Sequence, residues 1–337
     1  MLLQAKHDRM VQELLASEMA QVESRFSVEL LSDLACVNSL VTHVERYRGK
    51  MLRPMLVIVS GMATSADGVT VNDNQRSIAT VVEMVHMATL VHDDILDEAR
   101  VRRRGVTINQ LQGNETAVML GDYLISHAYH LCSVVASAPA ARLIALATNT
   151  VCEGELLQLA NRNNLDLDEG TYFEIIRRKT ASLCGTCCEL GAVLCDEPTP
   201  GQPGAALHEF GIHLGMAFQI IDDVLDLVGS EQTVGKTLGR DLGKGKLTLP
   251  LIHGLSSAPA AARSELQQIL RSPIDEADHR AATRVRDILT SCGSVDYANQ
   301  SARLAVARAK TALLALPATA ARGLLEELAE NVLTRQS

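Results

Sequence analysis

The sequence predicts an all-α protein, and three observations support that prediction. Hydrophobic residues make up 47% of the 337 residues, yet aromatic residues make up only 3% and tryptophan is absent. The apolar content is therefore aliphatic, and most of it comes from residues that favour helices. Apolar residues also recur with a helical period along most of the chain, and no convincing strand pattern interrupts them.

The expected helices can be followed from one end of the chain to the other. The stretch "CDEPTPGQPG" at 195–204 contains three prolines and two glycines and is the clearest interruption. Motifs lie on both sides of it, so we expect one domain over 1–337. A polar loop at 229–246 and two or three final helices are expected to complete the chain. The earlier helices are expected over 9–40 (one or two helices), from Pro54 onward, and over 77–98, 115–136, 140–160, 170–194 and 205–228.

Charge and hydropathy exclude several classes of protein. The net charge of −9 argues against a general nucleic-acid binder, which needs a basic face. The first residues include Lys6, Asp8 and Arg9, which leave no apolar core for a signal peptide. No run approaches the roughly 20 apolar residues of a membrane span. We therefore expect a cytoplasmic protein with no transmembrane segment.

The eight cysteines are expected to be thiols, because disulfides are rare in the cytosol. Cys184, Cys187 and Cys188 cluster in "SLCGTCCELGA", and a zinc site is one interpretation of that spacing. A structural zinc site would need a second close pair of ligands, and the other cysteines are scattered singly. Small buried thiols in a packed helix are the interpretation we favour.

Two acidic clusters share one spacing. "HDDILDEARVRRRG" contains Asp93, Asp94 and Asp97, and "FQIIDDVLDLVG" repeats the Asp-Asp-x-x-Asp pattern. Residues four apart share a helix face. Both clusters follow apolar runs, which places the carboxylates at helix C-termini, where the helix dipole disfavours anions. A single cluster could be a solvated acidic face, but two at matched spacing indicate that a bound cation offsets the unfavourable charge. Mg²⁺ bridged to substrate phosphates suits such carboxylates.

Basic residues lie near both acidic clusters. Each alone could be a solvated surface charge, but together they make a diphosphate site plausible. Lys50 and Arg53 in "GKMLRP" also stand beside an expected helix start, where free amides attract anions. The other basic residues of this group are Arg102, Arg103, Arg104, Lys179, Lys236 and Lys246.

These motifs together resemble those of the trans-polyprenyl diphosphate synthases, the head-to-tail prenyltransferases. "GKMLRP", "EMVHMATLVHDDILD", "RR", "GN…GDYL", "KTASL", "FQIIDDVLD", "GKTLGRDL" and "KLTLP" occur in the order of that family, over about 45–255. The resemblance implies the isoprenoid synthase fold, a bundle of ten or more helices around a deep central cavity, usually a homodimer. Residues 256–337 would be the C-terminal helices.

The resemblance also implies an ionisation–condensation–elimination mechanism. The diphosphate of an allylic substrate leaves, isopentenyl diphosphate attacks the allylic cation, and a proton is lost. Two or three Mg²⁺ ions would be held by Asp93, Asp97 and Asp222, supported by Asp94, Asp223 and Asp226. The leaving diphosphate would be drawn off by Arg102, Lys179, Lys236 and Lys246. Isopentenyl diphosphate would be held by Lys50, Arg53, His86 and Arg103, with Gly49, Thr180 and Gln219 as further substrate-binding residues.

Two details test the resemblance. His86 belongs to "EMVH", a Glu-x-x-His pair of the kind used in di-iron bundles. The other such pair, Glu276 and His279, lies in a polar stretch after Pro273, which argues against a di-iron site.

After the paired arginines the family usually continues Gly-Lys-Pro-Thr, whereas here Arg104 precedes Gly105. The missing proline and the added charge leave the conformation of that loop open, but they do not affect the paired arginines.

Product length is expected to exceed fifteen carbons and to be that of a quinone side chain. In this family the residues four and five before the first aspartate form a floor under the growing product. Here they are Thr89 and Ala88, neither of which is aromatic. A deeper floor, formed by Met84, Tyr123 or a partner subunit, could still limit the product to twenty carbons, so a geranylgeranyl or farnesyl diphosphate synthase is the alternative.

Three other protein classes share some of these features. A class I terpene cyclase has the first acidic cluster but usually an Asn/Ser/Glu pattern at its second metal site. A head-to-head synthase has a different acidic spacing and lacks "GKMLRP". A non-catalytic partner subunit typically loses acidic motif residues, whereas all six are present here.

Overall fold

The computed structural model describes residues 9–46, 49–102, 105–196, 203–228, 239–272 and 279–335, and it confirms the all-α class with more than ten helices. None of the described helices is long and apolar enough to cross a membrane. The elements are α1 (Arg9–Glu29), α2 (Ala35–Glu45), α3 (Leu52–Thr64), α4 (Asp73–Leu96), β1 (Val101–Arg102), β2 (Gly105–Val106), α5 (Ile108–Val134), α6 (Ala138–Ala160), α7 (Glu169–Ile176), the π-helical turn η1 (Arg177–Ala181), α8 (Ser182–Val193), α9 (Pro203–Val228), α11 (Arg240–Gly243), α12 (Leu249–Ser257), α13 (Ala260–Arg271), α14 (His279–Ser291), α15 (Ser294–Ala312), the 3-10 turn η2 (Leu313–Ala315) and α16 (Ala320–Leu333).

The chain forms two compact units, each made of several segments. Unit 1 consists of Met1–Thr148, Leu183–Gly211 and Thr311–Leu328. Unit 2 consists of Asn149–Ser182, Ile212–Lys310 and Ala329–Ser337. That the two units belong to one domain stays a prediction.

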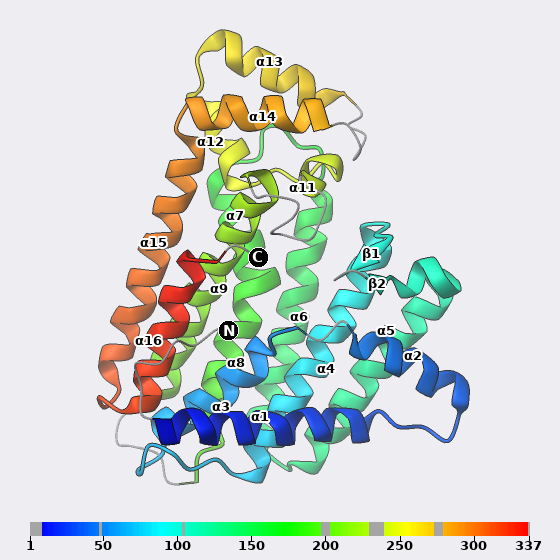
Figure 1. Cartoon of the computed structure of the whole chain (residues 1–337), viewed down its shortest axis with the longest axis vertical. Helices are drawn as coiled ribbons and strands as arrows, with labels where there is room; N and C mark the ends of the chain where they lie inside the picture. The colour runs from blue at the N-terminus through cyan, green and yellow to red at the C-terminus, as the bar shows by residue number, and fades with distance from the viewer. Residues whose placement is uncertain are drawn as a thin grey trace. The chain divides into compact units, whose positions relative to one another are not determined.

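Unit 1 is built around α4, which contacts α1, α3 and α5 (Figure 1). The contact between α4 and α5 is close because residue 121 is glycine. A Cβ atom there would lie 2.1 Å from Nε2 of His92, the residue before the first aspartate motif. The core of this unit is aliphatic, with Ile58 of α3 and Met84 of α4 fully buried. The end of α4 that bears the motif is therefore held firmly against α5.

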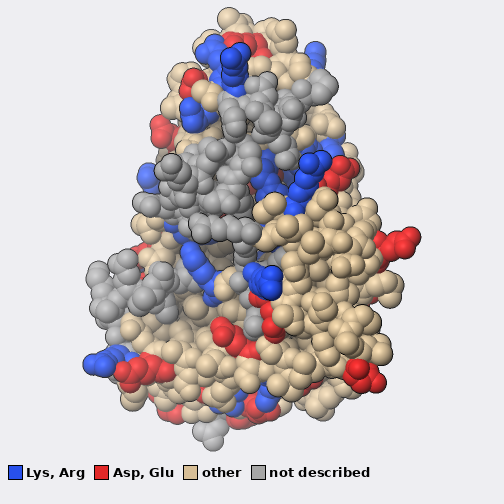
Figure 2. Space-filling model, turned by 45° about the vertical axis from the view of Figure 1, so that its right-hand side comes forward, with Lys and Arg blue, Asp and Glu red and all other residues tan. Residues whose placement is uncertain are grey.

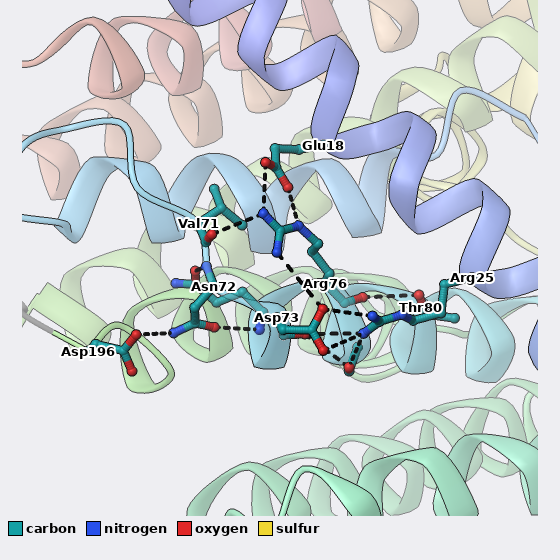
Figure 3. Close-up of polar contacts among 10 residues, drawn as sticks. Glu18, Arg25, Val71, Asn72, Asp73, Arg76, Thr80 and Asp196 are labelled. Atoms are coloured by element: carbon teal, nitrogen blue, oxygen red, sulfur yellow. Dashed lines mark hydrogen bonds and ion pairs between the residues drawn. The ribbon is translucent and has the colours of Figure 1, made fainter.

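The start of α4 is fixed by polar contacts (Figure 3). Asn72 caps the helix, accepting from the backbone N–H of Gln75, whose side chain accepts from the N–H of Asn72. Arg76 of α4 donates to Glu18 of α1 (Nη2–Oε1, 2.9 Å), and Arg25 of α1 donates to Asp73 (Nη2–Oδ1, 2.7 Å). The helix was expected from residue 77, and this capping box explains why it begins four residues earlier.

Unit 2 contains α7, η1, the C-terminal half of α9 and the short helices α12, α13 and α14. Among these, α12 contacts α7, α13 and α14, and α13 lies beside α14 (Figure 1). Asp168 caps α7 by accepting from the N–H of Thr171 (2.9 Å). An αL glycine at 239 begins α11, and a second at 245 packs against Asn163.

Three expectations about the elements were wrong. Among the described residues after 246, five α-helices occur, not two or three; turns near Pro259, Gly293 and Pro317 account for three of the breaks between them, and 273–278, between α13 and α14, lie outside the described part. A two-residue antiparallel pair, β1 with β2, occurs where no strand was expected. The expected loop at 229–246 contains α11, and its first ten residues lie outside the described part.

Candidate active site

The first aspartate motif ends α4 in unit 1. Asp93 and Asp94 lie in its last turn and Asp97 is its C-cap, as the spacing predicted. Asp94 is only 2% exposed and pairs with Arg102, whose Nε lies 2.9 Å from Oδ1 and whose Nη2 lies 2.8 Å from the same atom. Asp93 and Asp97 are half-buried. Arg102 thus holds the middle carboxylate inward and leaves the outer pair at the helix end.

The second motif lies in the last two turns of α9 in unit 2. Asp223 is 5% exposed and accepts hydrogen bonds from the Tyr172 hydroxyl (2.6 Å) and from Nε2 of Gln219 (2.8 Å). Asp222 is half-buried, and its Oδ1 lies 3.1 Å from Nη1 of Arg335. As in the first motif, the middle aspartate is buried against protein donors while the first aspartate is partly exposed. That the two motifs face one another stays a prediction.

Asp241 adds a fourth carboxylate beside the second motif. Its backbone N–H donates to Oδ2 of Asp226 (3.1 Å). Burial and then the charge of Asp241 raise the pKa of Asp226 to about 7, and the same two causes, burial first, raise the pKa of Asp223. Concentrated negative charge of this kind favours a bound cation. Sequence analysis missed Asp241, although it lies within the quoted motif "GKTLGRDL".

The "KTASL" motif contains a π-helical turn that the sequence did not predict. Lys179 and Thr180 both lie in η1, between α7 and α8. Lys179 forms an ion pair with Glu155, and the Thr180 hydroxyl donates to Oε1 of Gln219 (2.9 Å). A Cβ atom at Gly154 would lie 2.5 Å from the backbone N of Lys179, so α6 packs tightly against this turn. Single π-helical turns inside α-helices are frequent at functional sites.

A pocket within unit 2 brings many of the predicted residues together. The helices α6, α7, α9 and α11 contribute to it, together with the turn η1, the segment between α6 and α7 and the segment after α11. Apolar and amide side chains complete its wall, so polar groups occupy only part of it. The lining consists of Gln158, Asn161, Leu167, Tyr172, Ile175, Ile176, Lys179, Thr180, Gln219, Asp223, Asp241, Lys246, Leu247 and Thr248.

The remaining predicted residues of the described chain lie in unit 1. Gly49 and Lys50 are exposed just before α3, whose N-cap, Met51, has left-handed φ and ψ angles of 50° and 43°. Arg53 lies in the first turn of α3 and is half-buried. His86 is half-buried on α4, and its carbonyl accepts from the Thr89 hydroxyl (2.7 Å).

The two residues expected to form the floor under the growing product have small side chains and are buried or half-buried. Ala88 is fully buried and Thr89 half-buried on α4. Tyr123 of α5, one candidate for a deeper floor, donates its hydroxyl to the carbonyl of Leu30 (3.2 Å). Met84, the other candidate, is fully buried. Arg103 and Lys236 lie outside the described residues.

The donor set suits Mg²⁺ rather than a softer metal. Within the described ranges, no three His, Cys, Asp or Glu side chains are gathered as a complete metal site. Mg²⁺ does not need such a site, because it binds one or two carboxylates together with water and substrate oxygens. Cys184, Cys187 and Cys188 are all buried, and burial raises the pKa values of their thiols.

Charge on the drawn face of the molecule is mixed in sign. Figure 2 shows lysine and arginine in several small groups interspersed with aspartate and glutamate, rather than one broad basic area. A protein that binds duplex nucleic acid would need a continuous basic surface. Small basic groups of this kind instead suit compact anions.

Comparisons with known proteins point to one family. The family model for polyprenyl synthetase matches residues 35–288. Octaprenyl diphosphate synthase of Escherichia coli (strain K12) is 33% identical over 326 residues, covering 96% of this chain and 98% of the relative. All-trans-nonaprenyl-diphosphate synthase (geranyl-diphosphate specific) of Rhodobacter capsulatus is 34% identical over 320 residues, covering 95% of each chain.

A solved structure extends the likeness to the whole fold. The crystal structure of a polyprenyl synthase from Caulobacter crescentus CB15, complexed with calcium and isoprenyl diphosphate, has a TM-score of 0.89 and 31% identity, covering 99% of this chain and all of that one. The chain therefore belongs to the polyprenyl synthetase family and is a prenyltransferase.

Proposed function

We propose that this chain condenses an allylic diphosphate with isopentenyl diphosphate in a magnesium-dependent reaction and makes a medium- or long-chain polyprenyl diphosphate. The observation that carries the proposal is an arrangement that both motifs share. In each, a buried aspartate is hydrogen-bonded to protein donors and orients a partly exposed aspartate beside it. Octaprenyl and nonaprenyl diphosphate synthases among the relatives support the product class. The small residues Ala88 and Thr89 support it too, because neither blocks a growing chain.

Asp93, Asp97 and Asp222 would hold two or three Mg²⁺ ions at the allylic diphosphate. Bound Mg²⁺ supplies positive charge that neutralises the departing diphosphate. Calcium in the related Caulobacter structure supports a divalent-cation site. Buried Asp94 and Asp223 orient their neighbours, and Asp226 supports the second cluster.

The protein's own groups would complete the diphosphate site. Lys179 and Thr180 are fixed by the π-helical turn, and Gln219 bridges Thr180 to Asp223. Lys246 lines the same pocket. These groups hold the diphosphate oxygens before the bond breaks, so little reorganisation is needed as charge develops. Lys236 and Arg102 are proposed to act with them.

Isopentenyl diphosphate would bind in unit 1 near the start of α3. Lys50 and Arg53 flank the helix N-terminus, where free backbone N–H groups attract anions. Gly49, His86 and Arg103 are proposed to complete this site. The aliphatic surroundings of α4 would exclude water from the allylic cation, which water would otherwise trap.

We also propose a cytoplasmic homodimer of single-domain subunits. Helix α5 carries exposed apolar side chains that a partner subunit would cover, among them Val118, Met119 and Tyr129. Scattered exposed apolar residues are ordinary, but several on one helix mark an interaction surface. A partner seated on α5 would also support α4, which packs against it.

The decisive experiment is product sizing with the isolated chain. Purified protein is incubated with Mg²⁺, labelled isopentenyl diphosphate and allylic primers of ten, fifteen or twenty carbons. We expect magnesium-dependent products longer than twenty carbons. Asp93→Ala should lower turnover by about 10²-fold or more, since charge stabilisation of this kind contributes that much, while the circular dichroism spectrum stays unchanged.

Each other outcome of that experiment rejects a specific part of the proposal. Products that stop at fifteen or twenty carbons with excess isopentenyl diphosphate reject the product class. Near-normal turnover of Asp93→Ala removes that residue from the metal site. No turnover without a second protein indicates a partner subunit and rejects the homodimer.

A further inference from the structure

The last described residue of the chain, Arg335, lies on the second aspartate motif. Helix α16 ends at Leu333, and the Arg335 side chain two residues later is only 14% exposed. Its Cζ lies 4.0 Å from the centroid of the Phe218 ring, and its Nη1 lies 3.1 Å from Oδ1 of Asp222. Phe218 and Asp222 are one turn apart on α9, so one guanidinium covers both. All of these residues belong to unit 2.

The contact with Asp222 is electrostatic and exchangeable. Within the described chain, Nη1 of Arg335 has no acceptor in hydrogen-bond geometry, although it lies at ion-pair distance from the carboxylate. The ring of Phe218 attracts the cation over its face, and this attraction does not depend on Asp222. The guanidinium can therefore give up the carboxylate while the aromatic contact keeps it nearby.

The surroundings explain why a cation is needed at this position. Asp222 is followed by Asp223 and Asp226, and Asp241 adds further negative charge. A further negative charge among these groups is unfavourable, and a nearby positive charge lowers that cost. Arg335 supplies positive charge to Asp222 when no metal does. A divalent cation bound to the same Oδ1 would compete with it.

We propose that Arg335 is a built-in counter-ion of Asp222 that a divalent cation must displace, so that metal binding partly releases the C-terminal residues from α9, where only the contact with Phe218 then holds Arg335. The inference rests on the proposed role of Asp222 as a metal ligand. It makes Arg335 a positioning residue, because it acts through Asp222. By linkage, the factor by which the Arg335–Asp222 contact lowers the affinity for the metal equals the factor by which the bound metal weakens that contact.

The first test measures metal binding in the absence of turnover. Mn²⁺ affinity is determined by electron paramagnetic resonance on the full chain, with and without inorganic pyrophosphate. Arg335→Met keeps an apolar contact with Phe218 and removes the charge. We expect it to bind Mn²⁺ roughly two- to fivefold more tightly, the factor that corresponds to a partly exposed ion pair.

A matched variant controls for net charge. Lys310 pairs with Glu330 at 2.5 Å on the surface of unit 2, between α15 and α16. Lys310→Ala removes one positive charge without touching the acidic cluster, so its Mn²⁺ affinity should equal that of the wild type. Equal gains in both variants would show a general charge effect and overturn the proposal, as would unchanged or weaker binding in Arg335→Met.

A second measurement follows the chain end itself. Hydrogen exchange of the peptide that contains Thr334 and Arg335 should become faster when Mn²⁺ is added to the wild type. Unchanged or slower exchange overturns the proposed release. Asp222→Asn separates this inference from the proposed function: wild-type Mn²⁺ affinity in that variant removes the metal site and both ideas with it. Lost affinity there, with no gain in Arg335→Met, rejects the Arg335 role alone.

Discussion

The middle aspartate of each motif is a buried side chain that protein donors satisfy. Arg102 holds Asp94, and Tyr172 with Gln219 holds Asp223. Removing a donor would leave a buried carboxylate unsatisfied, which costs more free energy of folding than losing an exposed hydrogen bond. Tyr172 is the clearest case, because its ring is buried and burial raises the pKa of its hydroxyl. It therefore stays a donor across the physiological range.

Tyr172→Phe tests this arrangement at the scale of one atom. The variant keeps the ring and removes one buried hydrogen bond to a carboxylate, so we expect the free energy of unfolding to fall by about 1–3 kcal/mol. Urea unfolding of the metal-free protein measures it. Tyr297→Phe is the matched control: its hydroxyl donates to the half-buried Glu169 (2.8 Å), so the loss should stay below about 1 kcal/mol. Equal losses in the two variants would contradict the role of burial.

The π-helical turn is the element whose position matters most, because it carries Lys179 and Thr180. Glu174 of α7 fastens it by accepting from Arg177 (Nε–Oε2, 2.8 Å) and from Nε of Arg178. Arg178 also pairs with Glu153 of α6. These pairs tie α6, α7 and η1 together beside Gly154. The arginine hydrogen bonds, Arg177 first, lower the pKa of Glu174 to about 2.

Glu174→Gln should therefore alter how stability depends on pH. A lowered folded-state pKa gives stability that is present above the usual value of 4.5 and is lost as pH falls toward 2. We expect wild type to exceed the variant by less than about 1 kcal/mol at pH 6.5, because the pair is partly exposed, and by much less at pH 3. Chemical unfolding at both values measures the difference. A difference that grows on acidification would contradict the assignment, as would one that is insensitive to molar salt.

An element could be predicted from the sequence where its causes lie among neighbouring residues, and not where they depend on contacts with distant ones. The helices that end at the aspartate motifs, α4 and α9, were predicted because periodicity and acidic spacing are properties of neighbouring residues. The π-helical turn was not, because the close approach at Gly154 that accompanies it involves a different helix. Asp241 was missed for the same reason: its effect on Asp226 depends on a contact fifteen residues away.

At the scale of the whole molecule, the sequence predicted the all-α class and the family, since composition and ordered motifs suffice for both. It could not predict that Arg335 lies on Asp222, because the two are separated by more than one hundred residues and no motif links them. Contacts of this kind depend on how the last helix returns to α9. Subunit assembly likewise depends on contacts that are not local in the sequence. The exposed apolar face of α5 is the feature from which we propose it.

Met119→Glu tests the proposed dimer. Met119 is 64% exposed near the middle of α5, between Val118 and the exposed Tyr129. A buried, unpaired carboxylate in an apolar interface is unfavourable, so the dimer dissociation constant should rise about tenfold or more. Sedimentation velocity over a range of concentrations measures it. Leu314→Glu, at an exposed apolar position on η2, should leave association unchanged. Because α5 packs on α4, whose last turn contains Asp93, the dissociated variant should also unfold more easily than the dimer. If both variants associated as the wild type does, the interface would lie elsewhere.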